Sequence, residues 1–354
     1  MSGQSISNDK GSSSSVLKSF FINLLVGSLV SLIGLIVAIA AGEVVVRFVE
    51  WRSSQVKKWE DRSKEYFKPE LAKTMQDFFY SEKKEEGVYR IAAIGDSFTF
   101  APYMQFDDTF PKRMERWLNL NAVQPKIEVI NYGVPRYSTS HEIPVVERAI
   151  KEDSDLILMQ ITLNDPEIKT DWPTELIPDR TGKLNVSGGI YNYWHGLRFV
   201  TERVRTYRSR SEYRDYFYNL FDNPKAWGQF EQSWKKIVEI AKRSNKPIVA
   251  VIFPLFGITV GESYPFYPIH ERVGKFLSSL QVPYVDITNE YLDIPIERLQ
   301  VLPGYDRHPN EIGHRIAAEA ILRWLRTQSL LPPEAFPKHI EKQRIGINPK
   351  EVVQ

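Results

Sequence analysis

The fold predicted for this chain rests on YRIAAIGDSFT, residues 89–99. The apolar run 91–94 is typical of a buried strand, and Gly95 ends it. A carboxylate and a hydroxyl, Asp96 and Ser97, follow directly. In open parallel α/β sheets, ligands collect at the carboxyl ends of the strands. Ser97 is therefore a candidate nucleophile, provided that a base and an oxyanion site converge on it.

The chain after residue 88 alternates apolar runs with helical patterns. Strands are predicted at residues 90–94, 127–131, 156–162, 247–253 and 284–287, and helices at 109–121, 141–151, 227–245, 270–280 and 310–326. The strands are continuous hydrophobic runs, as expected when helices cover both faces of a sheet. We therefore expect an α/β domain over residues 88–330 with a doubly wound, five-stranded parallel sheet.

Composition excludes some chemistry. The 354 residues contain no cysteine, so disulfides and thiolate metal sites are absent. The net charge of +2 gives no bias toward a nucleic-acid partner. No glycine-rich phosphate loop is present, and no cofactor or metal site is indicated. Six histidines are the candidates for a catalytic base.

The N-terminal region predicts a membrane helix. Residues 1–18 are Ser-rich and are expected to be disordered. Residues 19–42 carry no charged side chain, and a bilayer core needs about 20 apolar residues. A cleaved signal peptide is the alternative, with Ala38-Ile39-Ala40 as a small-residue cleavage pattern. Because signal peptides have apolar regions of only about 7–15 residues, we favour an anchor.

The charges around this span bear on its orientation. Residues 43–87 are expected to be a stalk that continues the membrane helix, followed by a helical lead-in near 67–80. Two cations precede the span and four follow it: Lys10 and Lys18, then Arg47, Arg52, Lys57 and Lys58. By the positive-inside rule this count places the large domain in the cytoplasm.

Residues 167–226 interrupt the strand–helix alternation as an insertion. Its second half is rich in aromatic and arginine side chains: Tyr191, Tyr193, Trp194, Phe199, Tyr207, Tyr213, Tyr216, Phe217, Tyr218 and Phe221, with Arg198, Arg203, Arg205, Arg208, Arg210 and Arg214. We expect most of these aromatics to form a small core of a helical subdomain. The alternative is a lid that shapes the substrate pocket or touches lipid headgroups. Residues 331–354 are expected to be a peripheral tail.

Later strand ends supply partners for Ser97. Gly133 follows the second strand and permits close approach of its N–H, and Asn164 follows the third. His308 lies just before the last helix, with Asp306 placed to orient it. The N–H groups of Ser97 and Gly133 with the amide of Asn164 would make an oxyanion hole.

Other candidates have weaker contexts. Gly261-Glu262-Ser263 is similar to a nucleophile elbow but lacks its second glycine and following helix, so a loop is expected. His314 lies inside the last predicted helix, where we expect it to pack. The remaining histidines have no motif around them: His141, His195, His270 and His339.

Taken in order, Ser97, Gly133, Asn164 and His308 resemble the four blocks of the GDSL/SGNH hydrolase family. The resemblance covers residues 88–325 outside the insertion and implies a flavodoxin-like fold. It implies Ser97 as nucleophile, His308 as base and Asp306 as its orienting acid, with Ser97, Gly133 and Asn164 as oxyanion donors. Two positions depart from the family. Thr162 stands where a glycine is usual, and the acid lies two residues before the histidine instead of three, a spacing similar to that of relatives that acetylate polysaccharides.

The resemblance implies a membrane-anchored serine esterase that forms an acyl-enzyme on Ser97 without a cofactor. Anchored relatives generally work outside the cytoplasm, often on bacterial surface polysaccharides. On this ground we expect the catalytic domain outside the cytoplasm, against the orientation that the positive-inside rule gives. The expected substrate is an acylated polysaccharide or an ester-bearing small molecule. An O-acyltransferase, in which a sugar hydroxyl replaces water, shares every residue. A binding or scaffold module is the third alternative, and envelope-assembly proteins are possible partners of each.

Overall fold

The computed structural model describes residues 11–57, 77, 80–120, 125–168, 189–303 and 306–335. The side chains of 11–17, 53–57 and 205–211 are outside this description. The chain divides into two compact units. Unit 1 consists of Met1–Lys64 and Asn185–Arg205, and unit 2 of Glu65–Leu184 and Thr206–Gln354.

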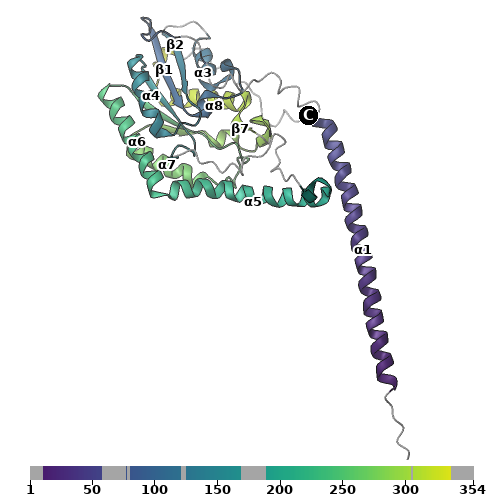
Figure 1. Ribbon diagram of the computed structural model, residues 1–354. Helices are drawn as coiled ribbons and strands as arrows, with labels where there is room; N and C mark the ends of the chain where they lie inside the picture. The colour runs from purple at the N-terminus through teal and green to yellow at the C-terminus, as the bar shows by residue number, and fades with distance from the viewer. Residues whose placement is uncertain are drawn as a thin grey trace, which may run out of the picture. The chain divides into compact units, whose positions relative to one another are not determined.

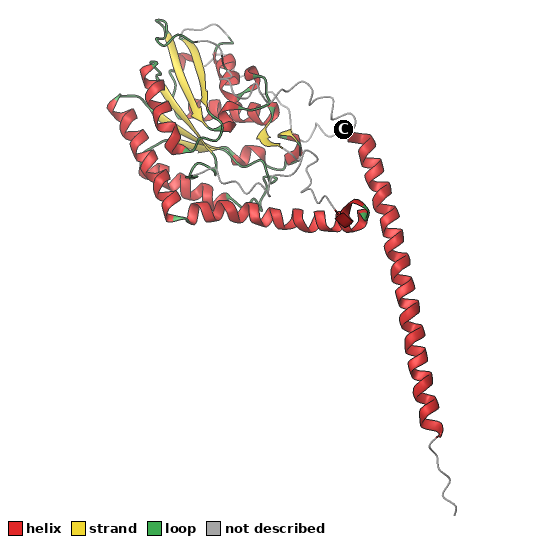
Figure 2. Ribbon diagram, in the orientation of Figure 1, coloured by secondary structure: helices red, strands yellow, loops and turns green. Residues whose placement is uncertain are grey.

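Unit 2 is built on a five-stranded sheet in the order β2-β1-β3-β4-β5 (Figure 2). Its strands are β1 Val88–Gly95, β2 Lys126–Gly133, β3 Leu156–Ile161, β4 Ile248–Ile252 and β5 Tyr284–Asp286. Every neighbouring pair is parallel. The predicted doubly wound parallel sheet is therefore confirmed, with the strand order of flavodoxin-like folds.

Helices cover both faces of this sheet (Figure 1). They are α3 Phe110–Leu118, α4 Thr139–Lys151, α6 Pro224–Arg243, α7 Tyr267–Ser279 and α8 Glu311–Thr327. α3 packs against α8, and α4 packs against α6. All five lie within three residues of their predicted bounds. β1, β2, β3 and β4 are almost wholly buried, which explains their continuous apolar sequence, whereas the edge strand β5 is half-buried.

Several short elements were not predicted. α2, Ser97–Phe100, follows β1, and an antiparallel pair joins β6, Gln300–Leu302, to β7, Asp306–Pro309. β7 reads Asp-Arg-His-Pro, so its sequence has no apolar pattern typical of a strand. The remaining elements of unit 2 are the 3₁₀ helices η3 Phe106–Asp108, η6 Thr288–Tyr291, η7 Ile296–Arg298 and η8 Pro333–Ala335.

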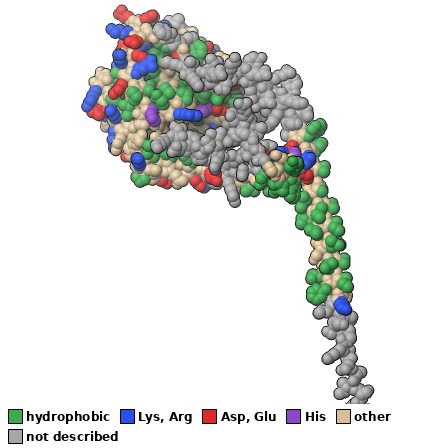
Figure 3. All heavy atoms as spheres, in the orientation of Figure 1, with side chains coloured by type: hydrophobic (Ala, Val, Ile, Leu, Met, Phe, Trp, Pro, Cys, Tyr) green, Lys and Arg blue, Asp and Glu red, His purple; other side chains and the backbone are tan. Residues whose placement is uncertain are grey.

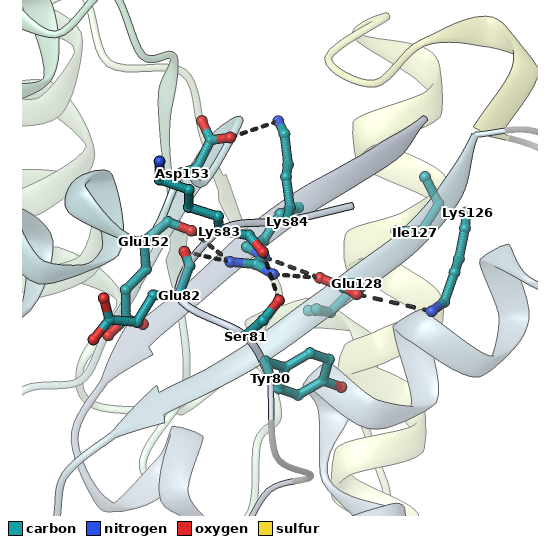
Figure 4. A network of polar contacts seen from close by, with 12 residues as sticks. Tyr80, Ser81, Glu82, Lys83, Lys84, Lys126, Ile127, Glu128, Glu152 and Asp153 are labelled. Atoms are coloured by element: carbon teal, nitrogen blue, oxygen red, sulfur yellow. Dashed lines mark hydrogen bonds and ion pairs between the residues drawn. The ribbon is translucent and has the colours of Figure 1, made fainter. Parts of the chain in front are cut away.

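A buried arginine, Arg90, holds the amino end of β1, and Figure 4 labels its partners Glu82, Glu128 and Glu152. Arg90 is fully buried, and its Nε donates to Glu128 Oε2 of β2 at 2.9 Å. Its Nη1 donates to the carbonyl oxygens of Glu82, at 3.2 Å, and Glu152, at 2.5 Å. A buried charge is tolerated when it is paired and hydrogen-bonded in this way. The lead-in near Glu82, β2 and the end of α4 are thus tied to one side chain.

Unit 1 contains α1, Gly11–Lys57. Gly11–Lys18 was expected to be unstructured, but this part of the chain is helical; residues 1–10 lie outside the described residues. The stretch Lys18–Arg52 is long and apolar enough to cross a membrane, and its most apolar 18-residue window has a mean hydropathy of 2.7 and no buried residue. The stalk does continue this helix, to Lys57. The predicted lead-in at 67–80 is described only at Asp77 and Tyr80.

The insertion differs from expectation. Its described part holds η5, Gly189–Asn192, and α5, His195–Asp222, which passes from unit 1 into unit 2. Tyr213, Phe217 and Phe221 are buried in the main core of unit 2. The prediction of a separate small core is therefore wrong for these three residues. Phe217, for example, packs edge-on against Phe266 of the main core, with 5.5 Å between the two ring centroids.

The domain also extends past its predicted end at residue 330. Leu331 and Ala335 are buried in the main core. Residues 331–335 therefore belong to the domain and not to a peripheral tail, and residues 336–354 lie outside the described residues.

Candidate active site

The turn after β1 presents Ser97 at the carboxyl edge of the sheet. Asp96 is the N-cap of α2, and its side chain accepts the Phe98 N–H at 2.9 Å. Ser97 is thereby the first residue of α2. A Cβ at Gly95 would lie 2.3 Å from Gln160 Oε1 and 2.4 Å from Thr99 Oγ1, so the glycine allows these two side chains to pack against the end of β1.

β7 brings a histidine and an acid to this serine. His308 Nε2 lies 2.7 Å from Ser97 Oγ, and His308 Nδ1 lies 2.6 Å from Asp306 Oδ1. Asp306 Oδ1 also accepts the His308 backbone N–H at 2.8 Å. Residues two apart on a strand face the same side, so the D-x-H spacing on β7 permits this contact. The structure thus joins Ser97, His308 and Asp306 in one hydrogen-bonded chain.

The charges around Ser97, His308 and Asp306 favour the protonated form of the His308 imidazole. Burial acts to raise the pKa of Asp306, but the charge and hydrogen bonds of His308 outweigh it and hold that pKa below the usual 3.8. Burial acts to lower the pKa of His308, yet Asp306 and the charge of Asp96 raise it above 6.5. The His308 side chain keeps 28% of its surface exposed. An imidazolium formed beside Ser97 is therefore stabilised by two carboxylates.

The three expected oxyanion donors are placed differently from one another. Ser97 N–H lies in the first turn of α2, where a helix offers its amides no internal partner. Asn164 Nδ2 donates one hydrogen to Asp96 Oδ2 at 3.0 Å, and an amide nitrogen carries a second. Thr162 Oγ1 donates to the same Asp96 oxygen at 2.9 Å and contacts Asn164 Oδ1. Thr162, the departure from the family pattern, thus helps to orient Asn164.

Gly133 has a packing role that the sequence did not indicate. Its N–H donates to Asn131 Oδ1 at 3.0 Å, so an oxyanion would have to share this hydrogen. A Cβ at Gly133 would lie 2.3 Å from the backbone nitrogen of Phe100. The glycine therefore allows α2 to approach the end of β2. Asn131 reinforces this approach, because its Nδ2 donates to the Thr99 carbonyl at 2.8 Å.

Two buried carboxyl groups next to Asp96 were not predicted from the sequence. Glu142 of α4 is 1% exposed, and neither of its side-chain oxygens has a hydrogen-bond partner among the described residues. Burial first, and then the charge of Asp96, raises the pKa of Glu142 well above 4.5. Burial, Glu142 and Asp96 likewise raise the pKa of Asp165. We therefore expect Glu142 to be neutral next to Asp96, whose side chain accepts three hydrogen bonds.

The competing histidines are engaged elsewhere. His314 packs as expected: its Nδ1 accepts the Phe110 N–H at 3.1 Å, and burial lowers its pKa to about 3. His141 belongs to the capping box of α4, and His270 Nδ1 lies 3.0 Å from Asp286. His195 pairs with Glu50, and His339 lies outside the described residues.

The two remaining sequence candidates are also placed. Gly261-Glu262-Ser263 is a loop, as expected. In the part of the chain that the structure describes, no three His, Asp or Glu side chains are grouped so that they could hold a metal ion.

No protein-family model matches this chain, and no curated protein matches it. An acetyl xylan esterase structure matches with a TM-score of 0.42 and 13% identity over 67% of this chain and 99% of its own. A catalytic mutant of an acetylxylan esterase from Geobacillus stearothermophilus matches with a TM-score of 0.42 and 17% identity over 66% and 93%. A lipase/acylhydrolase from Enterococcus faecalis matches with a TM-score of 0.40 and 13% identity over 68% and 96%. These TM-scores and identities are too low to indicate the chemistry of this protein, which is therefore inferred from the geometry around Ser97.

Proposed function

We propose that this protein is a membrane-anchored serine ester hydrolase of SGNH/GDSL type. The observation that carries the proposal is the chain of short contacts from Ser97 Oγ to His308 Nε2 at 2.7 Å, and from His308 Nδ1 to Asp306 Oδ1 at 2.6 Å. A serine becomes nucleophilic when an oriented base can take its proton, and this arrangement supplies both the base and its orienting group.

The mechanism follows from these roles. Neutral His308 donates Nδ1–H to Asp306 and accepts the Ser97 proton at Nε2 as Oγ attacks the ester carbonyl carbon. The carbonyl oxygen takes the electron pair and is held by the Ser97 N–H and the second hydrogen of Asn164 Nδ2. His308 then protonates the leaving alcohol, which leaves an acyl group on Ser97. Water, deprotonated by His308, attacks that ester and releases the acid.

The substrate and location are further parts of the proposal. The resemblance to anchored SGNH proteins favours an acylated cell-envelope polysaccharide or exopolysaccharide as substrate, with an ester-bearing small molecule as the simpler alternative. α1 is proposed to anchor the chain in the cytoplasmic membrane through residues 19–42, with the catalytic unit on the extracytoplasmic side. Proteins that assemble the envelope are proposed partners.

The orientation can be tested because the chain has no cysteine of its own. A single cysteine is introduced at exposed Gln328 (Gln328→Cys) and labelled in intact spheroplasts with a membrane-impermeant maleimide. Labelling before lysis is expected for an extracytoplasmic domain. Labelling only after lysis would reverse the orientation and support the positive-inside count.

O-acyl transfer is a second candidate function. The observation that favours it is the D-x-H spacing of Asp306 and His308, which is similar to that of relatives that acetylate polysaccharides. The same acyl-enzyme forms, and a sugar hydroxyl replaces water in the second step. Product analysis with an acyl donor and a glycan distinguishes the two, since free acid alone indicates the hydrolase and an acylated glycan the transferase.

The test of the proposed function is labelling of the detergent-solubilised full chain with a fluorophosphonate serine probe. Labelling is expected for the wild type and is expected to be lost in Ser97→Ala and His308→Ala. Ser263→Ala is the matched control, because Ser263 is exposed and lies in the sequence that imitates a nucleophile elbow. A folded wild-type protein that does not react would exclude an activated serine and leave a binding or scaffold module.

A further inference from the structure

After Gly42, α1 is no longer uniformly apolar and carries charged side chains. Three charged side chains, Glu43, Arg47 and Glu50, recur at helical spacing and therefore share one face. The other faces carry large apolar side chains that remain exposed: Val44, Val45, Phe48, Val49 and Trp51. Phe48 is 57% and Trp51 60% exposed. This part of α1 is therefore an amphipathic continuation of the apolar helix.

Another segment of unit 1 covers the charged face. Glu43 accepts the backbone N–H of His195 at 2.9 Å and of Gly196 at 2.5 Å, which are amides of the first turn of α5. Arg47 donates through Nε to Glu43 at 2.8 Å and through Nη2 to the Tyr193 carbonyl at 3.0 Å. A carboxylate at a helix N-terminus satisfies amides that have no partner inside the helix.

A second ion pair continues this contact. Arg198 Nη2 lies 2.8 Å from Glu50 Oε2, and His195 Nδ1 lies 2.6 Å from the same oxygen. The charges that α1 carries on this face are thus paired within the unit. What the contact leaves exposed is largely apolar. Ile190, Tyr193 and Val200 are 55%, 81% and 58% exposed.

The contact fixes the height of these side chains along α1. An α-helix rises about 1.5 Å per residue, so Glu43 to Glu50 lies about 1.5–12 Å beyond Gly42, the last residue of the uncharged stretch. The polar layer on each side of a bilayer core is about 5–8 Å deep. Tyr193, whose carbonyl oxygen accepts from Arg47 about 7.5 Å beyond Gly42, is therefore held within this layer, where tyrosine and tryptophan are enriched in membrane proteins.

We propose that residues 43–51 and 190–200, here called the collar, lie in the lipid headgroup layer as a second membrane contact of this chain. The inference rests on the proposed anchor. Lipid is favoured because the apolar surface of the collar continues that of the span (Figure 3), and because the acidic groups are paired inside it. Arg47, 54% exposed at its side chain, and exposed Arg52 suit lipid phosphates.

The test measures depth in the bilayer with single cysteines in the full chain. Tyr193→Cys carries an environment-sensitive fluorophore in liposomes that contain either headgroup-labelled or deep acyl-chain-labelled quencher lipids. Headgroup quenching is expected at position 193. Leu32→Cys, in the span, is expected to be quenched by the deep label, and exposed Gln328→Cys by neither.

Positions 32 and 193 distinguish a failure of the proposed anchor from a failure of the proposed collar. Loss of deep quenching at position 32 would overturn the anchor. Deep quenching at 32 with no headgroup quenching at 193 would overturn the collar alone. If 193 is also shielded from aqueous iodide, a protein neighbour occupies the surface instead of lipid, and disulfide cross-linking at 193 would identify a second copy.

A further variant tests the clamp itself. The double substitution Glu43→Ala/Glu50→Ala removes both acceptors of α5 and is expected to abolish most of the headgroup quenching at 193. Neither residue belongs to the catalytic chain, so fluorophosphonate labelling of Ser97 is expected to be unchanged and reports retained folding. Unchanged quenching at 193 in a folded double variant would contradict a collar held by these contacts.

Discussion

The substitution Asp306→Asn separates the charge of this side chain from its geometry. One oxygen, Oδ1, accepts both the Nδ1 hydrogen of His308 at 2.6 Å and its backbone N–H at 2.8 Å. Because both donors point at the same atom, an asparagine can keep its carbonyl oxygen there and hold the same histidine tautomer. The substitution then removes the negative charge and leaves the two hydrogen bonds.

The size of the effect follows from this geometry. Hydrogen bonds to charged groups contribute about 1.5–3 kcal/mol, and neutral ones about 0.5–1.5 kcal/mol. The difference of about 1–2 kcal/mol corresponds to a loss of about 5–30-fold in the rate of serine modification. Asp306→Ala removes the acceptor entirely, and its loss is expected to approach the ~10⁴-fold seen when a triad histidine is held in the wrong tautomer.

The pH dependence supplies an independent readout. His308 acts as a base only when it is neutral, so the rate rises with pH through its pKa. Asp306 raises the pKa of His308 above 6.5, so Asp306→Asn is expected to move the acidic limb of the profile to lower pH. The assay is the rate of fluorophosphonate labelling, with hydrolysis of an activated acetate ester as a second measure.

A matched control and a refuting result complete the experiment. Asp293→Asn makes the same chemical change at an exposed loop position and is expected to alter neither rate nor pH profile. An Asp306→Asn loss as large as that of Asp306→Ala would refute the single-oxygen geometry. A wild-type rate with an unshifted profile would show that Asp306 does not act on His308.

Three further predictions concern neighbouring residues. Asn164→Ala removes a proposed oxyanion donor and is expected to slow ester hydrolysis by about 10²–10³-fold in a variant that remains folded; an unchanged rate would argue against that role. Gly133→Ala places a Cβ 2.3 Å from the Phe100 backbone nitrogen, so a destabilisation of about 1–3 kcal/mol is expected in denaturant unfolding, and an unaltered midpoint would contradict the packing role. The raised pKa of Glu142 contributes stability that is fully present below about pH 4.5 and is lost as pH rises toward the folded-state pKa. Glu142→Gln is therefore expected to flatten the fall of melting temperature with pH, and identical slopes would show that Glu142 is ionised in the folded protein.

Elements whose residue pattern is local could be predicted from the sequence. Strands such as β1 and β3 are buried on both faces, so each appears as a short continuous apolar run whatever its neighbours are. The long apolar helix that we propose as the anchor is equally local, because its length and lack of charge are properties of one segment. Ser97 could be selected because Gly95 and Asp96 end a strand next to it.

The contacts between distant segments could not be predicted from the sequence and are seen in the folded structure. β7 is polar, and its pairing with β6 is what presents His308 to Ser97, 211 residues earlier. The aromatics of α5 join the main core because Phe266 reaches Phe217. Glu142 appears in the sequence as an ordinary charged residue of a helix, yet burial beside Asp96 and Asp165 raises its pKa. Burial and the partners of a polar group depend on residues far away in the chain, and a local pattern carries no record of them.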